Sequence, residues 1–305
     1  MPLIAHLNKF ARLLPPSRYK AVLGRLITDR LLSSSVSTVT EVPMLAGHRL
    51  LLDPRSRTEG GPFWNGERDE EDVAFLKACL QPGDTVFDVG ANVGMITIPL
   101  GCRLAALGSG EMFAFEPIEA NYERLTANIQ LNGLKDIVRA FHVALGDAEG
   151  TLELSVETRR GSQTGNAIAS KIVGEREGYT RISCLLTQLD TLVENQGITK
   201  VDVMKVDIEG AEMLFLNGAV KCIETHRPMI FGEFNAGLMP NFGHSFLDVF
   251  AFFKARDYRG FGFANALLPH ELIDPSPSTG NAFFVANEKA DFLLKRIADA
   301  RSQIK

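Results

Sequence analysis

The segment Asp84–Ile98, with the sequence DTVFDVGANVGMITI, constrains the fold more than any other part of the chain. Its mostly apolar residues from Val86 to Val89 predict a buried strand that follows a turn. The strand ends at Gly90, and the almost wholly apolar run from Met95 to Leu107 predicts a buried helix. A strand, a glycine-containing turn and a helix present backbone N–H groups at a helix N-terminus to a ligand. The segment therefore predicts a ligand-binding turn in an α/β protein.

The spacing of the glycines in this turn indicates which class of ligand it suits. Gly90 and Gly94 have no Cβ, so the backbone can approach a ligand closely there. A dinucleotide-binding turn requires the pattern G-x-G-x-x-G, whereas this chain has D-x-G-x-N-x-G with Asn92 in the middle. The spacing disfavours a pyrophosphate and favours a nucleoside without phosphates, with Asp88 placed to meet a polar or cationic part of it. The alternative interpretation is a tight turn that only connects the strand to the helix.

The length of 305 residues allows one large α/β domain with an appendage. We predict an N-terminal appendage of helices and short strands over residues 1–68, and the main domain over residues 69–305. The four cysteines are scattered, without a C-x-x-C pair or the spacing of a structural zinc site, and three of them lie in apolar runs. This pattern favours buried free thiols in a reducing compartment, and we expect a cytoplasmic protein.

Charge is distributed unevenly along the chain. The net charge is −5, but residues 1–35 hold six basic residues and one acidic residue, a sum of +5, so the remaining residues sum to −10. The acidic main domain argues against nucleic acid as a partner. No apolar run in the N-terminal segment is long enough for a signal peptide or a membrane span. Its two amphipathic helices, separated by Pro15–Pro16, are predicted to pack on the main domain; weak peripheral contact with an anionic membrane is the alternative.

Strand and helix patterns alternate over the rest of the chain, which predicts a mostly parallel sheet with right-handed crossovers. A short hairpin is expected over residues 45–53. Pro99 lies near the start of the helix after the glycine turn and predicts a kink or a later start of that helix. The polar stretch 158–179, between the strands of a second hairpin, is expected to be a mobile loop. Longer strands are predicted over residues 86–89, 111–115, 138–145, 151–156, 181–186, 201–206, 228–234, 258–263 and 282–286.

Four of the predicted strands end in acidic residues: Asp88, Glu116, Asp207 and Glu233. Ligands of open α/β sheets bind beyond the carboxyl ends of the strands, where the strand order reverses. We therefore expect these four residues to surround one cleft. A carboxylate at Glu116, at the end of the second main strand, can accept hydrogen bonds from both hydroxyls of a ribose. The alternative for Glu116 is an acid at the surface end of a strand.

Five ordered motifs together resemble the FkbM family of S-adenosylmethionine-dependent methyltransferases. The resemblance extends from about residue 63 to about residue 284, and the basic segment 1–35 lies outside it. Five motifs in order are far more specific than one glycine turn. They are Asp88-Val-Gly-Ala-Asn-Val-Gly94, Phe115-Glu-Pro117 with Asn121, Ala144-Leu-Gly-Asp147, Thr187-Gln-Leu-Asp190 and Lys205-Val-Asp-Ile-Glu-Gly-Ala-Glu212.

The resemblance implies a fold, a cofactor and a set of binding residues. The fold would be the Rossmann-like class I methyltransferase fold, a seven-stranded, mostly parallel sheet with an antiparallel last strand and helices on both faces. The cofactor would be S-adenosyl-L-methionine, with its ribose on Glu116 and its adenine bordered by the backbone around Ala144 and Leu145. The methionine moiety would lie on Asp88, Gly90, Asn92 and Gly94, and the implied cofactor set also includes Ala91, Pro117, Asn121 and Asp207.

Methyl transfer to a hydroxyl also needs a base that takes the hydroxyl proton. Asp207 is the first candidate because it ends the strand beside the cofactor strand, and Glu209, Glu233 and His244 follow. Asp207 could instead cap the next helix, and Glu212 could be only a structural ion pair. Asp207 and Glu209 could also bind a divalent ion, but the sequence shows no third ligand and we predict no metal site.

The leading hypothesis is an O-methyltransferase for a hydroxyl of a sugar, glycolipid or other secondary metabolite. Its partner would be a small-molecule or glycan acceptor, and residues 158–179 and 237–244 are the predicted substrate-facing segments. A dehydrogenase with a nicotinamide cofactor (NAD) is a second hypothesis, and the glycine spacing argues against it. A third hypothesis is a cofactor-binding scaffold that has lost catalysis.

Overall fold

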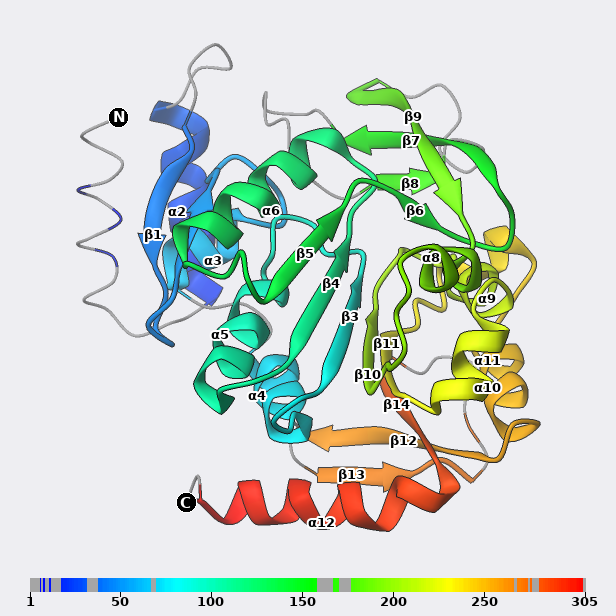
Figure 1. Ribbon diagram of the computed structural model, residues 1–305. Helices are drawn as coiled ribbons and strands as arrows, with labels where there is room; N and C mark the ends of the chain where they lie inside the picture. The colour runs from blue at the N-terminus through cyan, green and yellow to red at the C-terminus, as the bar shows by residue number, and fades with distance from the viewer. Residues whose placement is uncertain are drawn as a thin grey trace.

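The computed structural model describes residues 6, 8, 11, 18–31, 38–66, 70–157, 167–169, 177–265, 268–273, 275 and 280–303 (Figure 1). The largest sheet has eight strands in the order β13-β12-β14-β11-β10-β3-β4-β5. The pairs that join β11, β10, β3, β4 and β5 are parallel, and β14 runs antiparallel between β11 and β12. The strands are β3 Thr85–Val89, β4 Glu111–Phe115, β5 Val138–Phe141, β10 Val203–Val206, β11 Met229–Glu233, β12 Tyr258–Asn265, β13 Leu268–Glu271 and β14 Asn281–Ala286.

The order of the strands reverses beside β3. The chain passes from β3 to β4 and β5 on one side, and it later returns to place β10 and β11 on the other side. The reversal point, where ligands of open α/β sheets bind, therefore lies between the carboxyl ends of β3 and β10. The mostly parallel sheet with an antiparallel last strand, β14, confirms the predicted class I methyltransferase-like architecture.

The sheet has one strand more than the seven predicted. β13 pairs antiparallel with β12 at the edge of the sheet. Its sequence, Leu-Pro-His-Glu, has no alternation of apolar and polar residues, and it contains a proline, which is tolerated mainly in edge strands. The local sequence therefore carries no strand signal, and the strand forms because it pairs with β12.

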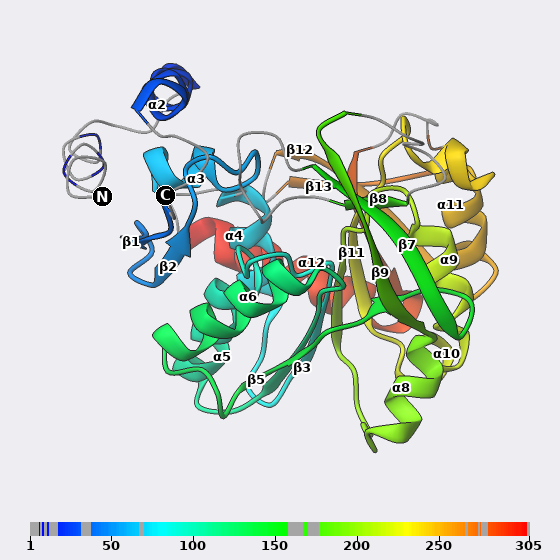
Figure 2. The ribbon, with the colours of Figure 1, turned by 90° about the horizontal axis from the view of Figure 1, so that it is seen from above.

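Helices cover both faces of the sheet, as predicted (Figures 1 and 2). Side chains along each strand alternate between two apolar cores: in β3, Val86 belongs to the first core and Phe87 to the second. The first core contains residues of α4 (Glu70–Cys79), α5 (Thr97–Leu107), α6 (Glu119–Leu131) and α12 (Asn287–Gln303). The second contains residues of α8 (Leu189–Asn195), α9 (Glu212–Asn217), α10 (Val220–His226) and α11 (Phe246–Lys254).

Two predicted elements have different bounds in the structure. The predicted strand 138–145 divides after β5, and β6 (Ala144–Leu145) pairs with β9 (Tyr179–Thr187) in another sheet. The prediction of one continuous strand was therefore wrong. Helix α5 begins at Thr97, so Pro99 is its third residue and the predicted later start is confirmed. The N–H of a residue in the first helical turn has no partner within the helix, so proline removes no helical hydrogen bond there.

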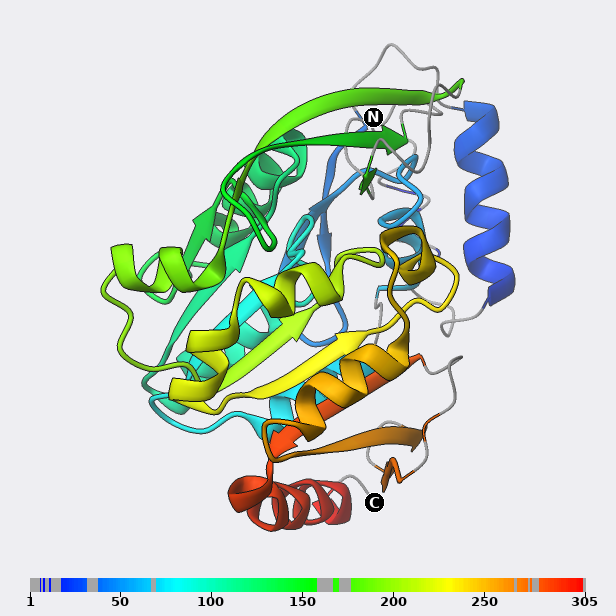
Figure 3. The same ribbon diagram turned by 90° about the vertical axis from the view of Figure 1, so that its right-hand side faces the viewer.

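A second sheet, in the order β6-β9-β7-β8, lies beyond the carboxyl ends of β3, β4 and β5 (Figures 1 and 3). β7 (Gly150–Glu157) pairs antiparallel with β9 and confirms the predicted hairpin, and β8 (Ala167–Ala169) pairs with β7. Most of the stretch 158–179 lies outside the described residues, so its mobility stays a prediction.

The described N-terminal elements pack on the main domain through the first apolar core. β1 and β2 form a hairpin around Gly47, as predicted, but its first strand lies before the predicted range 45–53. The buried side chains of this region belong to the same apolar core as α5 and α6; they include Val42, Leu50, Phe63 and Trp64. The elements are α2 (Arg18–Leu31), β1 (Thr40–Pro43), β2 (Arg49–Leu52) and α3 (Gly60–Asn65).

The division of the chain at residue 68 stays a proposal. Among the helices that the structure describes, none has the length and apolarity needed to cross a membrane. All four cysteines are free thiols, and Cys79, Cys184 and Cys222 are buried.

Candidate active site

A pocket of about 450 Å³ lies at the reversal point of the sheet, beyond the ends of β3, β4, β10 and β11. This volume is in the usual range for a small-molecule site. The pocket brings together most of the residues that the sequence predicted for a site. Those that line it are Gly90, Ala91, Asn92, Glu116, Pro117, Asn121, Ala144, Leu145, Asp207, Glu209 and Glu233.

The glycine turn has a left-handed backbone at three of its residues. The φ angles are +79° at Gly90, +50° at Asn92 and +96° at Gly94. A Cβ on Gly90 would lie 2.0 Å from the backbone oxygen of Asp207. Glycine is therefore required at position 90 because the loops after β3 and β10 touch there. The sequence had suggested close approach to a ligand, and the structure adds close approach between the two loops that form the pocket floor.

Glu116 joins the end of β4 to the glycine turn. Its side chain is almost fully buried, and Oε2 accepts a hydrogen bond from the backbone N–H of Asn92 at 2.8 Å. Oε1 accepts hydrogen bonds from the backbone N–H of Ile118 at 3.0 Å and from Nδ2 of Asn121 at 3.1 Å. Burial raises the pKa of Glu116 to about 7, although these hydrogen bonds oppose the shift. The carboxylate thus fixes the turn and also faces the pocket.

Asp88 does not line the pocket, contrary to the expected ligand contact. Its side chain is fully buried, and Oδ2 accepts a hydrogen bond from the hydroxyl of Thr97 at 2.6 Å. Asp88 follows Val86 by two residues, so both side chains point toward α5. The ammonium of Lys205 lies 3.2 Å from Oδ1 of Asp88 and 3.8 Å from Oδ2 of Asp207. Asp88 therefore contacts Thr97 and Lys205 below the pocket floor and does not face the pocket itself.

Lys205 connects the two central strands at the pocket floor. Its Nζ donates a hydrogen bond to the carbonyl of Gly90 at 3.0 Å. Burial would lower the pKa of Lys205, but Asp88 and Asp207 outweigh burial and raise that pKa, so the ammonium stays charged. Lys205 thus pairs with the carboxylates of both Asp88 and Asp207.

The loop after β10 is held by a buried carboxylate. Glu209 has a φ of +55° and Gly210 a φ of +99°. Oε1 of the fully buried Glu212 accepts a hydrogen bond from the backbone N–H of Gly210 at 3.0 Å. No ion pair to Glu212 occurs among the described residues, so the structural ion pair considered for it is replaced by this contact. The N-cap of α9 is Ala211, so Asp207 does not cap that helix.

Gly94 and His244 also lie outside the pocket lining. A Cβ on Gly94 would meet Leu125 and Ile98 at 3.0 Å and 3.1 Å, so this glycine allows the turn to lie close to α6. His244 follows the short helix η2 (Met239–Phe242), and its backbone N–H bonds the carbonyl of Met239. No cluster of three or more potential metal ligands occurs within the part of the chain that the structure describes.

Several pocket residues had no signal in the sequence. Unlike Phe242, which lines the pocket from the predicted substrate-facing segment 237–244, they come from the N-terminal region, the second sheet and the helix after β10: Thr58, Leu152, Glu153, Leu154, Leu186 and Leu214. None belongs to a recognisable motif, and each reaches the pocket only through the tertiary fold. These residues form the walls that lie away from the glycine turn.

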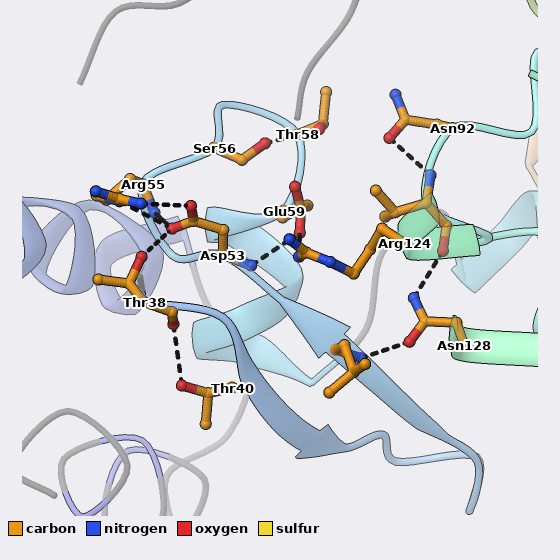
Figure 4. A network of polar contacts seen from close by, with 12 residues as sticks. Thr38, Thr40, Asp53, Arg55, Ser56, Thr58, Glu59, Asn92, Arg124 and Asn128 are labelled. Carbon is orange, nitrogen blue, oxygen red and sulfur yellow. Dashed lines mark hydrogen bonds and ion pairs between the residues drawn. The ribbon is translucent and has the colours of Figure 1, made fainter. Parts of the chain in front are cut away.

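A polar network links the N-terminal region to the glycine turn (Figure 4). Asn128 of α6 is fully buried; its Oδ1 accepts a hydrogen bond from the N–H of Leu51 at 2.6 Å, and its Nδ2 donates to the carbonyl of Val93 at 2.8 Å. Oε2 of Glu59 accepts a hydrogen bond from the N–H of Asp53 at 2.8 Å and lies 3.4 Å from Arg124. The network holds the loop that carries Thr58 against α6 and the pocket.

The charges of the pocket suit a cation and oppose a phosphate. Of the described residues, one with a basic side chain lines it, Lys205, together with six acidic residues: Glu116, Asp147, Glu153, Asp207, Glu209 and Glu233. A pyrophosphate would be repelled by such a lining, whereas a sulfonium would be attracted. The left-handed glycine turn and the buried acceptor Glu116 also fit a nucleoside. The described residues are therefore compatible with S-adenosylmethionine and disfavour a nicotinamide dinucleotide.

We expect the two buried carboxyls to make the protein less stable as the pH rises from about 5 to about 8. Burial raises the pKa of both Glu116 and Glu212 to about 7, from an ordinary value of 4.5. The folded protein therefore holds these protons more tightly than the unfolded chain, and stability falls as they dissociate. The expected loss is on the order of 2 kcal/mol per group, measured by urea unfolding at both pH values.

The variants Glu116→Gln and Glu212→Gln should each remove part of this pH dependence. Glu119→Gln, at the exposed start of α6, is the matched control and should leave it unchanged. The prediction would be contradicted if the free energy of unfolding changed with pH in the same way in the wild type, in Glu116→Gln and in Glu212→Gln.

Several curated proteins similar to this chain are named as methyltransferases. Methyltransferase sdnD of Sordaria araneosa is 28% identical over 170 residues, which cover 48% of this chain and 64% of sdnD. Hexuronic acid methyltransferase AglP of Haloferax volcanii is 28% identical over 174 residues, 57% of this chain and 65% of AglP. The 31-O-demethyl-FK506 methyltransferase FkbM of Streptomyces tacrolimicus is 28% identical over 162 residues, 46% of this chain and 60% of that protein. The matched part spans a little under two thirds of each relative.

Among solved structures, methyltransferase FkbM from Methylobacillus flagellatus KT is 16% identical, with a TM-score of 0.47, and covers 72% of this chain and 48% of that chain. The fold assignment stands on the strand order and the antiparallel β14. The model of the methyltransferase FkbM domain matches residues 88–259, which is more than half of the 305 residues. The chain therefore belongs to the FkbM methyltransferase family.

Proposed function

We propose that this protein is an S-adenosylmethionine-dependent methyltransferase that methylates a hydroxyl group of a sugar or another small molecule. The observation that carries the proposal is the pocket at the reversal point, where a glycine turn and six carboxylates surround space for a cationic nucleoside. Membership of the FkbM family supports methyl transfer. The names of two relatives, a hexuronic acid methyltransferase and a 31-O-demethyl-FK506 methyltransferase, support a hydroxyl-bearing acceptor.

The binding residues follow from the pocket geometry. Glu116 would accept hydrogen bonds from the ribose hydroxyls, and Gly90 and Asn92 would border the methionine moiety. Ala144 and Leu145, which line the pocket from β6, would border the adenine. When bound, the cofactor supplies an electrophilic methyl group on its sulfonium. The protein then has to align the acceptor oxygen with that methyl group, which is a positioning effect.

Asp207 is the proposed base that takes the acceptor's proton. Its side chain is 38% exposed and lines the pocket at the end of β10. A positioned base contributes about 10²–10⁴-fold to the rate. The ammonium of Lys205, 3.8 Å away, fixes the direction of the carboxylate. Glu209 and Glu233 line the same pocket and are the alternative bases.

The direct test is incubation of the protein with methyl-labelled S-adenosylmethionine and a cell extract, followed by identification of the labelled product. We expect label in an ether on a hydroxyl-bearing acceptor, with hexuronic-acid glycans as the first purified acceptors to try. Turnover of NADH without affinity for S-adenosylmethionine would favour the oxidoreductase hypothesis instead. Tight cofactor binding without transfer to any acceptor would favour the inactive scaffold.

Replacing Glu116 with alanine should weaken binding of S-adenosylmethionine by about 1–3 kcal/mol, the scale of a charged hydrogen-bond acceptor. The change removes the proposed ribose contact and also the acceptor that holds the N–H of Asn92. Isothermal titration calorimetry measures the effect, with exposed Glu119→Ala as the control. Unchanged affinity in Glu116→Ala would exclude Glu116 from the binding site.

A further inference from the structure

Helix α2 packs on the protein through one face. A Cβ on Gly24 would lie 2.4 Å from ring atoms of Trp64 in α3, so glycine is needed for the two helices to approach. Thr28, one turn later, is buried, and its hydroxyl donates a hydrogen bond to the carbonyl of Gly24 at 2.8 Å. Ile27 packs against the same apolar core. This inner face bears out the prediction that the basic N-terminal segment includes a helix packed on the main domain.

The opposite face of α2 is apolar and exposed. Val22, Leu23 and Leu26 have 58%, 59% and 55% of their surface accessible to solvent. Their spacing places them on one side of a helix, and the exposed Arg30 follows Leu26 by one turn. The other large exposed apolar residues that the structure describes are single residues on separate elements: Leu45, Leu185, Leu247, Ile273 and Phe292. The α2 face is thus an apolar cluster that the described residues of the protein leave exposed.

The charge of the N-terminal segment that contains α2 is complementary to an anionic surface. The sequence of α2 contains Arg18, Lys20, Arg25 and Arg30 against Asp29, a sum of +3. Residues 1–35 sum to +5 and the remaining residues to −10. An anionic surface therefore attracts the segment that carries the apolar face and repels the rest of the molecule. An apolar helical face beside basic residues is typical of helices that lie in a lipid interface.

The position of α2 allows such contact. Figures 2 and 3 show the helix at the periphery, with α3 between it and the main sheet. The helix has 14 residues, which is too short to cross a bilayer but sufficient to lie along its surface. A two-fold contact with a second copy of this chain would bring two basic segments together, which makes self-association through α2 unfavourable.

We propose that α2 docks this protein on an anionic lipid surface. Val22, Leu23 and Leu26 insert at the level of the headgroups, while the exposed Arg30 contacts the anionic lipids. The inner face of α2 stays on α3, so docking needs no rearrangement of the fold. This inference does not depend on methyl transfer, because it concerns a surface outside the pocket.

The test is co-sedimentation of the full chain with phosphatidylcholine vesicles, with and without added phosphatidylglycerol, in the absence of cofactor and acceptor. We expect binding to the anionic vesicles that weakens as salt is added. Leu23→Gln with Leu26→Gln should lower the partition coefficient at least about tenfold, and Arg30→Gln about fivefold. The matched control is Leu185→Gln with Leu247→Gln, which removes two exposed leucines from β9 and α11 and should bind as the wild type does.

Three results would overturn the proposal. The first is that the wild type does not bind anionic vesicles, and the second is that it binds neutral and anionic vesicles equally. The third is that the control variant and the α2 variant lose the same amount of vesicle binding. If light scattering shows a dimer that only the α2 substitutions dissociate, the face is instead a contact between two copies of the chain. Because the substituted leucines are exposed, both double variants should keep the wild-type melting temperature, and Arg30→Gln tests the charge contribution independently. A negative result here leaves the methyltransferase proposal untouched.

Discussion

Replacing Asp207 with asparagine should lower kcat for methyl transfer by about 10²–10⁴-fold, the contribution expected of a positioned general base. Asparagine keeps the shape of the side chain at the end of β10 but cannot take the acceptor's proton. Asp207 is the pocket carboxylate next to Lys205, and its backbone oxygen is the atom that Gly90 approaches. The substitution should therefore change kcat far more than the affinity for the cofactor. The measurement uses the acceptor that the labelling experiment identifies.

Glu209→Gln and Glu233→Gln are the matched controls, because both carboxylates line the same pocket. If Glu209→Gln or Glu233→Gln shows the large loss and Asp207→Asn does not, the base is assigned to that residue. If none of the three changes kcat tenfold, no pocket carboxylate among them acts as a base.

The central part of the site was predictable because parallel strands bring their carboxyl ends to one edge of a sheet. Gly90, Glu116, Asp207 and Glu233 each follow a short apolar run that ends abruptly, so both the strand and its end could be read from the sequence. The reversal point follows from the strand order, and it lies where the pocket is found. Local pattern therefore located the floor of the site.

The orientation of Asp88 and the walls of the pocket needed the structure. A side chain at the end of a strand can lie above the edge of the sheet or point sideways into a helix, and the sequence position is the same in both cases. Asp88 points sideways, toward Thr97. Thr58 reaches the pocket because two hydrogen bonds hold its loop on α6. Leu51 bonds Asn128, which is 77 residues away in the chain, and Glu59 bonds Arg124, which is 65 residues away. Such contacts leave no periodic trace in the sequence, and neither does the short break at residues 142–143 that moves β6 into a second sheet.

Replacing Lys205 with methionine should lower the free energy of unfolding by about 3–5 kcal/mol, the cost of leaving a buried charge without its partner. The ammonium lies 3.2 Å from Asp88, whose side chain is fully buried, and it also bonds the carbonyl of Gly90 at 3.0 Å. Methionine preserves the length and most of the volume of lysine, so the loss should come from the charge and the hydrogen bond. Urea unfolding at neutral pH measures it.

Lys200→Met is the matched control, because Lys200 lies only 2.9 Å from Asp202 but its side chain is 55% exposed. An exposed ion pair contributes about 0–1 kcal/mol, so the closer pair should matter less than the buried one. Adding Asp88→Asn to Lys205→Met should recover part of the loss, because the uncompensated charge is then removed. Two results would show that Lys205 does not stabilise the protein by neutralising Asp88. One is an equal loss of unfolding free energy in Lys205→Met and Lys200→Met, and the other is no recovery when Asp88→Asn is added to Lys205→Met.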